Sequence, residues 1–336
     1  MIELASVFCD GLVLQANKTN YIFGYGKGEV KVEFCGKTYA ATADGDKWII
    51  ALNPETYKNN LELVVYLNGE RKVVKNVAVG EVYLVAGQSN AQLRVGEEIC
   101  GNDDYTADED LRFFAVNRPE KDDAVFLESD GWQSVRKETV KRFSAIAYHT
   151  GAELRKKLGV VVGMVECYQG ASVIQSWLKK SSADKFEGLV DYSLRKATSS
   201  ANGYFWNENG FLYESMFSHI IPFAFARVIW YQGESNGYLP EATIYGDMIK
   251  TLITDWRADL KDENLPFSVV VICDMVGQSE GFTALQNAQR KFDGVLSGVT
   301  LVESSDVCEH STIHPNDKRA LSMRIADSIC NINSEF

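Results

Sequence analysis

This chain of 336 residues lacks several features that would point to particular classes of function. Its seven cysteines include no Cys-x-x-Cys pair, which argues against a zinc site and against a disulfide framework. It has no glycine-rich phosphate loop, and no run reaches the roughly 18 apolar residues that a membrane span needs. We therefore expect no metal, no nucleotide cofactor and no membrane-spanning segment.

Positive charge is also scarce, because 34 Lys and Arg residues stand against 46 Asp and Glu residues and leave a net charge of −12. Nucleic acids and anionic membrane surfaces are bound through basic patches, so we expect neither as a partner. The scattered cysteines indicate reduced thiols, and residues 1–4 show no basic or apolar leader. Both observations predict a cytoplasmic protein; a chain trimmed of its leader would instead be secreted or periplasmic.

Two patterns divide the sequence near residue 79. Residues 1–78 consist of short alternating runs separated by glycine turns, and the Asp-Gly and Asn-Gly pairs at 44–45 and 68–69 predict hairpins. From residue 79, apolar strands alternate with amphipathic helices, which is typical of a parallel, doubly wound sheet. We therefore expect a small all-β sandwich domain at 1–78 and an α/β domain at 79–336.

The periodicity of the second part predicts its individual elements. Strands are expected at 81–86, 160–167, 226–232, 267–273 and 299–303, and helices at 143–158, 241–259, 283–294 and 317–331. The segment 95–140 is acidic and irregular, and the segment 179–220 carries no clear strand. We expect both to be excursions over the sheet that shape the choice of substrate.

Ser89 is the predicted nucleophile. It belongs to a Gly-Gln-Ser-Asn turn at 87–90, directly after a strand-like apolar run. An open α/β sheet presents reactive groups at the carboxyl ends of its strands, and free N–H groups at a helix start can stabilise an oxyanion. A helix-capping role for this serine is compatible with catalysis.

His314 is the predicted general base. The chain has four histidines, and His149 and His219 lie in segments where packing or a surface position explains them. His310 stays an alternative to His314, but only His314 precedes a proline just before the final helix. An ordinary imidazole is largely neutral near pH 7 and can accept a serine proton.

Seven short motifs follow one another in an order that resembles one family. They occupy residues 10–15, 87–90, 143–148, 169–172, 230–236, 255–257 and 314–315. In this order they resemble the SGNH hydrolases, specifically the sialate O-acetylesterase group of carbohydrate acetylesterases. The resemblance implies a three-layer α/β/α flavodoxin-like domain. It also implies a serine esterase that removes O-acetyl groups from sialic acid or xylan-type oligosaccharides through an acyl-enzyme, without a cofactor.

The same resemblance implies three donors for the oxyanion. Two are the backbone N–H groups of Ser89 and Gly170. The third is a side-chain amide from the motif at 230–236, which leaves Asn236 and Gln232 as alternatives.

In this family an acidic residue completes a catalytic triad with the serine and the histidine. The sequence departs from the family at this acid. The family carries an acid two or three residues before the histidine, where this chain has Thr312 and Ser311. We favour Glu234 as the replacement, because its motif matches the family. The alternatives are Asp306, Glu309, or a Ser–His dyad in which a backbone carbonyl orients the histidine.

Aromatic residues in the glycine- and asparagine-rich stretch at 204–206 are suited to stacking on sugar rings. We expect Tyr204 and Trp206, together with Gln88 beside the nucleophile, to contact an O-acetylated carbohydrate. Two other functions stay open. One is an esterase or thioesterase of a non-carbohydrate acyl group. The other is a carbohydrate-binding homologue whose catalysis is impaired, which the missing acid would explain.

Overall fold

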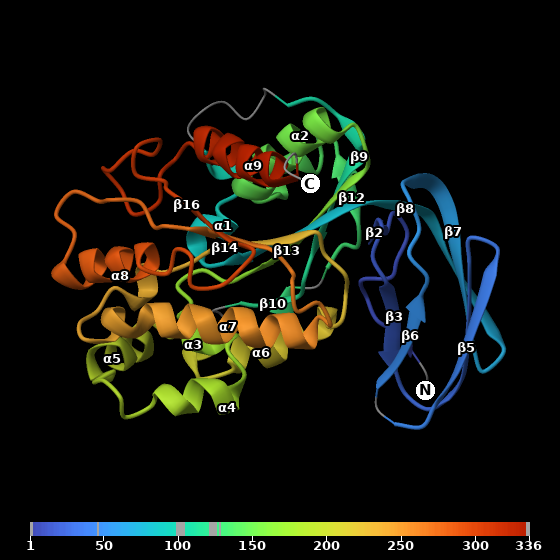
Figure 1. Ribbon diagram of the computed structural model, residues 1–336, viewed down its shortest axis with the longest axis horizontal. Coiled ribbons are helices and arrows are strands. Elements are labelled where there is room, and N and C mark those ends of the chain that lie inside the picture. The colour runs from blue at the N-terminus through green and yellow to red at the C-terminus, as the bar shows by residue number, and fades with distance from the viewer. Residues whose placement is uncertain (1–2, 46, 99–104, 121–125, 128, 334–336) are drawn as a thin grey trace.

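The computed structural model describes residues 3–45, 47–98, 105–120, 126–127 and 129–333 (Figure 1). The described residues before position 88 form strands and turns, without a helix. These strands are β1 (Glu3–Leu4), β2 (Val13–Gln15), β3 (Asn20–Tyr25), β4 (Gly28–Phe34), β5 (Lys37–Ala43), β6 (Lys47–Leu52), β7 (Lys58–Leu67) and β8 (Glu70–Gly87).

One of the two hairpins predicted in this part is confirmed. Leu67 of β7 faces Glu70 of β8, and Asn68 and Gly69 between them have positive φ angles of 50° and 86°, as a two-residue hairpin turn requires. The Asp-Gly pair at 44–45 lies between two strands that belong to different sheets, so the hairpin predicted there is not formed. β5 pairs with β4, whereas β6 pairs with β3, so this connection leads from one sheet to the other.

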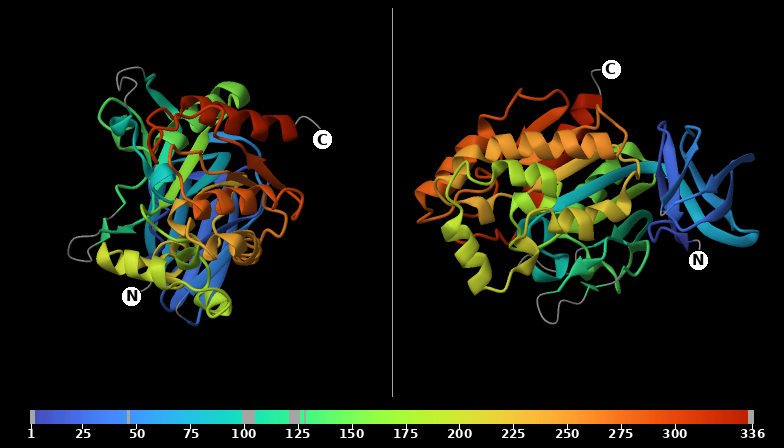
Figure 2. Two further views of the ribbon diagram at one scale, coloured as in Figure 1. Left: turned by 90° about the vertical axis from the view of Figure 1, so that its left-hand side faces the viewer. Right: turned by 90° about the horizontal axis from the view of Figure 1, so that it is seen from below.

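β8 is the element that joins the two parts of the chain. Its first half pairs with β7, and its second half pairs with strands of the central α/β sheet. The boundary predicted between residues 78 and 79 therefore falls inside a single strand of 18 residues. Figure 2 shows this strand running from the amino-terminal strands into the body of the molecule.

The central sheet has the order β12-β9-β13-β8-β14-β15-β16. All neighbouring pairs are parallel except β12 with β9, which is antiparallel. The five predicted strands are all present, as the second half of β8 and as β13, β14, β15 and β16. After β8, the strands of the described residues are β9 (Asp108–Ala115), β10 (Arg118–Pro119), β11 (Phe126–Leu127), β12 (Gln133–Val135), β13 (Val162–Tyr168), β14 (Arg227–Tyr231), β15 (Phe267–Val270) and β16 (Val299–Val302).

The prediction for segment 95–140 was wrong in one respect. This segment contributes β9, which lies beside β13 with four consecutive buried residues, Leu111 to Phe114. Charged residues precede these four positions and Arg112 lies among them, so the hydrophobic pattern by which buried parallel strands are recognised is interrupted.

Helices cover the sheet on both sides in Figure 1, with α2 and α9 above it and α3, α6 and α7 below it. The four predicted helices are present as α2, α7, α8 and α9. The helices are α1 (Ser89–Gln92), α2 (Ala145–Leu158), α3 (Ile174–Trp177), α4 (Lys180–Ala183), α5 (Ser193–Ala201), α6 (Phe211–Ser215), α7 (Tyr245–Asp259), α8 (Glu280–Arg290) and α9 (Arg319–Asn333).

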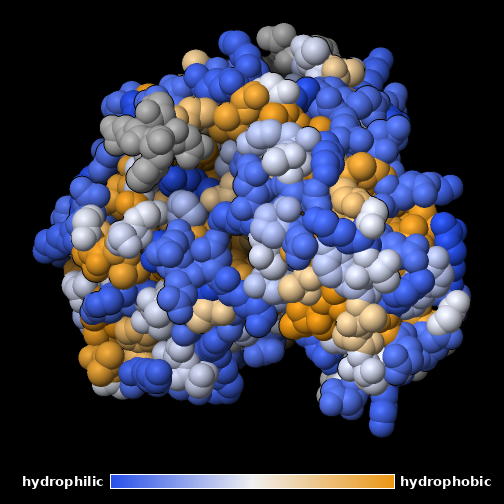
Figure 3. Space-filling model, turned by 45° about the vertical axis from the view of Figure 1, so that its right-hand side comes forward, coloured by the Kyte–Doolittle hydropathy of each residue, from blue (hydrophilic) through white to orange (hydrophobic). Residues whose placement is uncertain are grey.

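Local sequence explains where α2 begins and ends. The hydroxyl of Ser144 accepts a hydrogen bond from the N–H of Ala147, and Gly159 ends the helix with a φ of 68°. Within the described residues, no helix is long and apolar enough to cross a membrane. Hydrophilic residues cover most of the face drawn in Figure 3, with hydrophobic residues interspersed among them.

Candidate active site

Three central strands end side by side, and the turns that follow them carry the sequence motifs. β13 and β14 flank β8, so Tyr168 and Tyr231 both lie opposite Gly87. Gly87 has a φ of 140°, and a side chain there would come within 2.0 Å of the Tyr231 carbonyl oxygen. Glycine is therefore required at this position, and the turn places Ser89 at the start of α1, on the carboxyl edge of the sheet.

Ser89 and His314 come together at this edge. Nε2 of His314 lies 2.8 Å from Oγ of Ser89, and both side chains are half-buried. Burial lowers the pKa of His314 below its usual 6.5, and the charge of Lys318 lowers it further, while Glu97 opposes the shift. The imidazole is therefore neutral at pH 7, and Nε2 can accept the serine proton.

The other histidines have different partners. Nε2 of His149 lies 2.9 Å from a carboxylate oxygen of Glu98, and Nε2 of His310 lies 2.7 Å from the backbone oxygen of Ser305. His219 belongs to a short 3₁₀ helix at Phe217–Ile220. The contact with Ser89 thus distinguishes His314 from the alternative His310.

In the part of the chain that the structure describes, no carboxylate forms a hydrogen bond or ion pair with His314. Asp306 forms an ion pair with Arg324, with N–O distances of 2.5 and 2.6 Å. Glu309 accepts a hydrogen bond of 2.8 Å from the N–H of Asn316. The structure therefore brings neither of these two alternative acids to the histidine.

Glu234, the favoured acid, is linked to the segment of His314 through one intervening side chain, that of Asn90. Its Oε1 accepts a 2.5 Å hydrogen bond from Nδ2 of Asn90, and burial raises the pKa of its carboxyl group. The same Asn90 nitrogen donates to the backbone oxygen of Ile313 at 2.9 Å. Glu234 is thus joined to the segment that carries His314 through Asn90, and the geometry does not support a direct contact with the imidazole.

Lys318 completes this cluster and was not found by sequence reasoning. Its side chain is fully buried, and Nζ donates to Oδ1 of Asn90 at 2.6 Å. Burial lowers the pKa of Lys318 to about 8. In the sequence, nothing distinguishes this lysine from the others, apart from its place four residues after His314.

Gly170 lies beside the nucleophile. A Cβ atom built on Gly170 would lie 3.8 Å from Cβ of Ser89. The N–H of Gly170 donates a 2.7 Å hydrogen bond to Oε1 of Gln92, which lies one helical turn after Ser89. The predicted oxyanion donor therefore has a partner already, and Gln92 is a second residue of the site that sequence reasoning missed.

Comparison with known proteins then decides the family. Residues 79–331, which make up more than half of the chain, match the family model described as "Carbohydrate esterase, sialic acid-specific acetylesterase". The chain belongs to this acetylesterase family. The matched residues include Ser89, Gly170 and His314.

Named relatives agree with this assignment. The chain is 23% identical to the sialate O-acetylesterase of Homo sapiens, over 86% of this chain, and it spans 61% of the length of that protein. It is 21% identical to the sialate O-acetylesterase of Mus musculus, over 96% of this chain and 72% of the mouse protein. The crystal structure of a carbohydrate acetylesterase from Xanthomonas citri superposes with a TM-score of 0.85 at 26% identity, covering 100% of this chain and 76% of that one.

In this member of the acetylesterase family, the amides of Gln232 and Asn236 are engaged away from Ser89. Nε2 of Gln232 donates to oxygens of Gln88, Ser172 and Asn236 at 3.0, 3.0 and 2.8 Å. Nδ2 of Asn236 donates to Glu241 at 2.6 Å. Both side chains are fully buried, so the geometry does not support the predicted oxyanion role of either amide.

Gln88 likewise holds two turns together. Its Oε1 accepts hydrogen bonds from the N–H groups of Gly233 and Ser235, at 3.2 and 3.1 Å, as well as from Gln232. Its side chain is buried. The contact with substrate predicted for Gln88 therefore has no support in this geometry.

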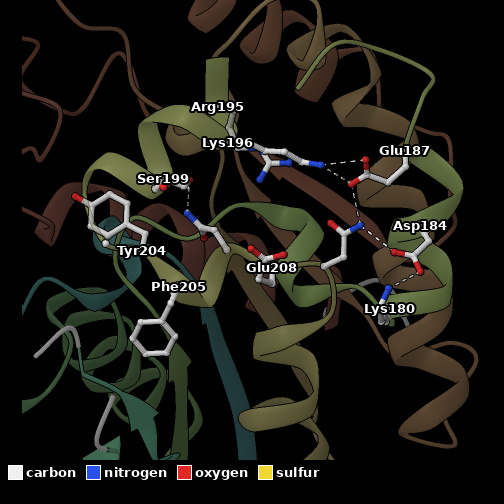
Figure 4. A pocket seen from close by; sticks show the side chains of 13 residues that line it. Lys180, Asp184, Glu187, Arg195, Lys196, Ser199, Tyr204, Phe205 and Glu208 are labelled. Carbon is white, nitrogen blue, oxygen red and sulfur yellow. Dashed lines mark hydrogen bonds and ion pairs between the residues drawn. The ribbon is translucent and has the colours of Figure 1, made fainter. Parts of the chain in front are cut away.

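The two aromatic residues predicted to contact a sugar occupy different environments. Trp206 is only 3% exposed. Tyr204 is half-buried, and its ring centroid lies 5.4 Å from that of Trp206. Tyr204 lines a cavity of about 730 Å³ that is drawn in Figure 4. Of the predicted pair, Tyr204 is the one whose surroundings suit contact with a ligand.

Proposed function

We propose that this protein is a serine esterase that removes O-acetyl groups from carbohydrates through an acyl-enzyme. We place the reaction in a three-layer α/β/α flavodoxin-like SGNH domain that follows an all-β sandwich. The observation that carries the proposal is the 2.8 Å contact between Oγ of Ser89 and Nε2 of His314 at the carboxyl edge of the sheet. Membership of the acetylesterase family supports an acetylated sugar as substrate, with sialic acid and xylan-type oligosaccharides as the two classes to compare.

In the first half of the reaction, Oγ of Ser89 attacks the carbonyl carbon of the acetyl group while Nε2 of His314 takes the hydroxyl proton. The carbonyl oxygen becomes an oxyanion, to which the N–H groups of Ser89 and Gly170 would donate hydrogen bonds. Because Oε1 of Gln92 occupies the Gly170 N–H, the substrate oxygen displaces the Gln92 side chain as it binds.

His314 then returns the proton to the sugar oxygen, and the bond between that oxygen and the acetyl carbon breaks. The acetyl group stays on Ser89 as an ester. Water attacks this ester with His314 again taking a proton, and acetate leaves as the serine hydroxyl is restored. In each half-reaction, Nε2 first accepts a proton and then gives it up. The imidazole must therefore be neutral when each half-reaction begins.

A Ser–His dyad fits these contacts, since no described carboxylate forms a hydrogen bond or ion pair with the imidazole. The cluster of Asn90, Glu234 and Lys318 would instead hold the backbone at Ile313, and with it the position of His314. Such a dyad lacks a carboxylate to stabilise the imidazolium, so we expect slower turnover than in a complete triad.

The test is acetate release from O-acetylated sialic acid, from acetylated xylo-oligosaccharides and from 4-nitrophenyl acetate between pH 5 and pH 9. We expect turnover to rise with pH through a pKa below 6.5, because burial favours the neutral imidazole. Ser89→Ala should abolish turnover, whereas the matched variant Ser6→Ala, on the exposed surface, should retain it.

The alternatives give other results. An enzyme for longer acyl groups would hydrolyse octanoyl esters faster than acetyl esters. A carbohydrate-binding homologue would bind sugars and release no acetate while folded. Activity that persists in Ser89→Ala would remove Ser89 from the mechanism.

A further inference from the structure

A cavity among the described residues is lined by the segment from Lys180 to Asn209. Its volume is about 730 Å³, within the range that proteins use to hold small ligands. Its walls come from α5, from the 3₁₀ turn Phe205–Asn207 and from the segment around α4. Figure 4 shows Tyr204 and Phe205 at one end, and Lys180, Asp184 and Glu187 at the other.

Asn207 connects this cavity to the turn that carries the predicted oxyanion donor. Its Nδ2 donates to the backbone oxygen of Ala171 at 2.9 Å, and its Oδ1 accepts from the N–H of Val173 at 3.0 Å. Ala171 directly follows Gly170, which lies beside Ser89. The turn that approaches Ser89 at Gly170 is therefore also in contact with Asn207, which lines the cavity.

The wall formed by α5 is anchored by contacts within the protein. Arg195 of α5 is only 3% exposed and forms an ion pair of 3.4 Å with the buried Glu241. Ser199, one turn later, accepts a 3.0 Å hydrogen bond from Nδ2 of Asn207. A preformed wall of this kind binds a ligand without having to become ordered first.

The charges around the cavity largely cancel. Lys180 pairs with Asp184 at 2.7 Å, and Lys196 pairs with Glu187 at 3.2 Å. Nδ2 of Asn209 bridges the two carboxylates at 3.0 and 3.1 Å. An anionic ligand would meet carboxylates here, and it would have to break these pairs to bind the lysines. The lining thus favours a neutral ligand that both donates and accepts hydrogen bonds.

The aromatic end narrows the ligand class further. Tyr204 and Phe205 both line the cavity, and Phe205 packs edge-on against Phe211 at a centroid distance of 5.6 Å. The C–H faces of a pyranose pack on aromatic rings, while its hydroxyl groups require polar partners. The aromatic end of the cavity suits the C–H faces of a sugar, and the end that carries the ion pairs suits its hydroxyl groups.

We propose that this cavity binds a neutral sugar unit of an oligosaccharide whose acetylated unit lies at Ser89. The inference rests on the proposed acetylesterase function and extends it, because it makes an acetylated oligosaccharide a better substrate than an acetylated monosaccharide. Tyr204 is the main contact, and Glu208 offers a polar partner for the sugar hydroxyls.

The catalytic test compares kcat/KM for an acetylated xylotetraose, an acetylated methyl xyloside and 4-nitrophenyl acetate. We expect the tetrasaccharide to exceed the monosaccharide by about tenfold, the value of one good aromatic contact. Tyr204→Ala should lower that ratio toward one. Tyr57→Ala, a matched variant at an exposed tyrosine of the amino-terminal strands, should leave the ratio unchanged.

A binding test keeps the inference independent of turnover. Calorimetry with Ser89→Ala measures the affinity for unacetylated xylo-, cello- and galacto-oligosaccharides and for an acidic sialyl-oligosaccharide. We expect a neutral oligosaccharide to bind, and the double variant Ser89→Ala/Tyr204→Ala to bind it about tenfold more weakly.

The outcomes separate the two proposals. Hydrolysis of 4-nitrophenyl acetate without a preference for the tetrasaccharide, and without Tyr204-dependent binding, would overturn the cavity proposal alone. Binding with no turnover in the wild-type protein would overturn the esterase and support the cavity. Tighter binding of the acidic oligosaccharide than of every neutral one would overturn the assignment of a neutral sugar.

Discussion

Asn90 joins three groups that lie far apart in the sequence. One amide contacts the carboxylate of Glu234, the ammonium of Lys318 and the backbone oxygen of Ile313. Each of the two charged side chains is buried, and a buried charge without partners is costly. At the residue scale, the amide thus stabilises two opposite charges while it fixes the segment that presents His314.

The role of Glu234 can be tested by changing its charge without changing its shape. Glu234→Gln keeps an oxygen that can accept from Asn90, so we expect kcat to fall by less than about tenfold, whereas loss of a true triad acid costs up to about 10⁴-fold. Glu234→Ala removes the acceptor and should cost more in both kcat and thermal stability. Steady-state kinetics with thermal melts would check this. A drop of several thousandfold in Glu234→Gln, with unchanged stability, would instead make Glu234 the catalytic acid.

Gln92 gives a second prediction at this scale. Because its Oε1 occupies the N–H of Gly170, Gln92→Ala should raise kcat/KM for a small acetyl ester by about two- to tenfold, the value of one net hydrogen bond. Gln92→Glu should lower kcat/KM, since a carboxylate binds the N–H more strongly and repels the oxyanion. The rate of 4-nitrophenyl acetate hydrolysis measures both. A loss of about 100-fold in Gln92→Ala would show that Gln92 is itself an oxyanion donor.

At the scale of elements, Glu166 of β13 connects the sheet to two helices. Its Oε1 accepts from the N–H of Ser144, which caps α2, at 2.8 Å, and its Oε2 accepts from the hydroxyl of Tyr168 at 3.1 Å. The Ser144 hydroxyl in turn donates to the backbone oxygen of Ala91 in α1 at 2.6 Å. This buried chain of contacts positions the helix that begins with Ser89 relative to β13.

Glu166 also makes stability depend on pH. Burial raises its pKa from 4.5 to about 7, against the lowering effect of its hydrogen bonds and of Arg94 and Arg118. The folded state therefore holds a proton that the unfolded state has already lost, so this contribution to stability is present below pH 4.5 and is lost as the pH rises to about 7.

We expect the free energy of unfolding of the wild-type protein, relative to Glu166→Gln, to fall by about 3 kcal/mol between pH 4.5 and pH 7.5. Glutamine keeps an acceptor for Ser144 and does not titrate, which isolates the effect of the proton. Urea unfolding of both proteins across this range is the measurement. A constant difference between the two proteins would mean that Glu166 keeps an ordinary pKa.

At the scale of the whole molecule, the amino-terminal strands and the α/β part are built as one unit. They share β8, and Arg112 of β9 reaches across with hydrogen bonds of 3.0 Å to the carbonyl of Gly11 and 2.6 Å to that of Asn76. Trp132 donates to the carbonyl of Val7 at 2.9 Å. A strand that runs through both parts leaves no flexible linker at which they could separate.

We therefore expect the protein to unfold in a single transition. Arg112→Met should lower the stability of this one transition by about 2–4 kcal/mol, because it removes hydrogen bonds from a buried cation to backbone carbonyls on both sides. Differential scanning calorimetry gives the number of transitions and their shift. Two separate transitions in the wild-type protein, or a variant that shifts only one of two, would contradict a shared unit.

Several features of this protein could be read from the sequence alone. The Gly-Gln-Ser-Asn turn after an apolar run and the His-Pro pair before the last helix predicted that Ser89 and His314 would meet. Parallel strands end at one edge, so local patterns in an α/β chain also indicate where the turns gather. The Asn68-Gly69 turn was equally predictable, because positive φ at both positions is a local requirement.

Which polar side chains face the nucleophile depends on how distant segments pack together. Glu234, Gln232 and Asn236 belong to the predicted motif, yet their side chains bond to Asn90, Gln88 and Glu241, respectively. Gln92 and Lys318 carry no sequence signal, yet they reach the site. A motif fixes where the backbone turns. The direction of each side chain depends on which buried donors and acceptors must find partners, and those partners are brought together only when strands distant in sequence pack side by side.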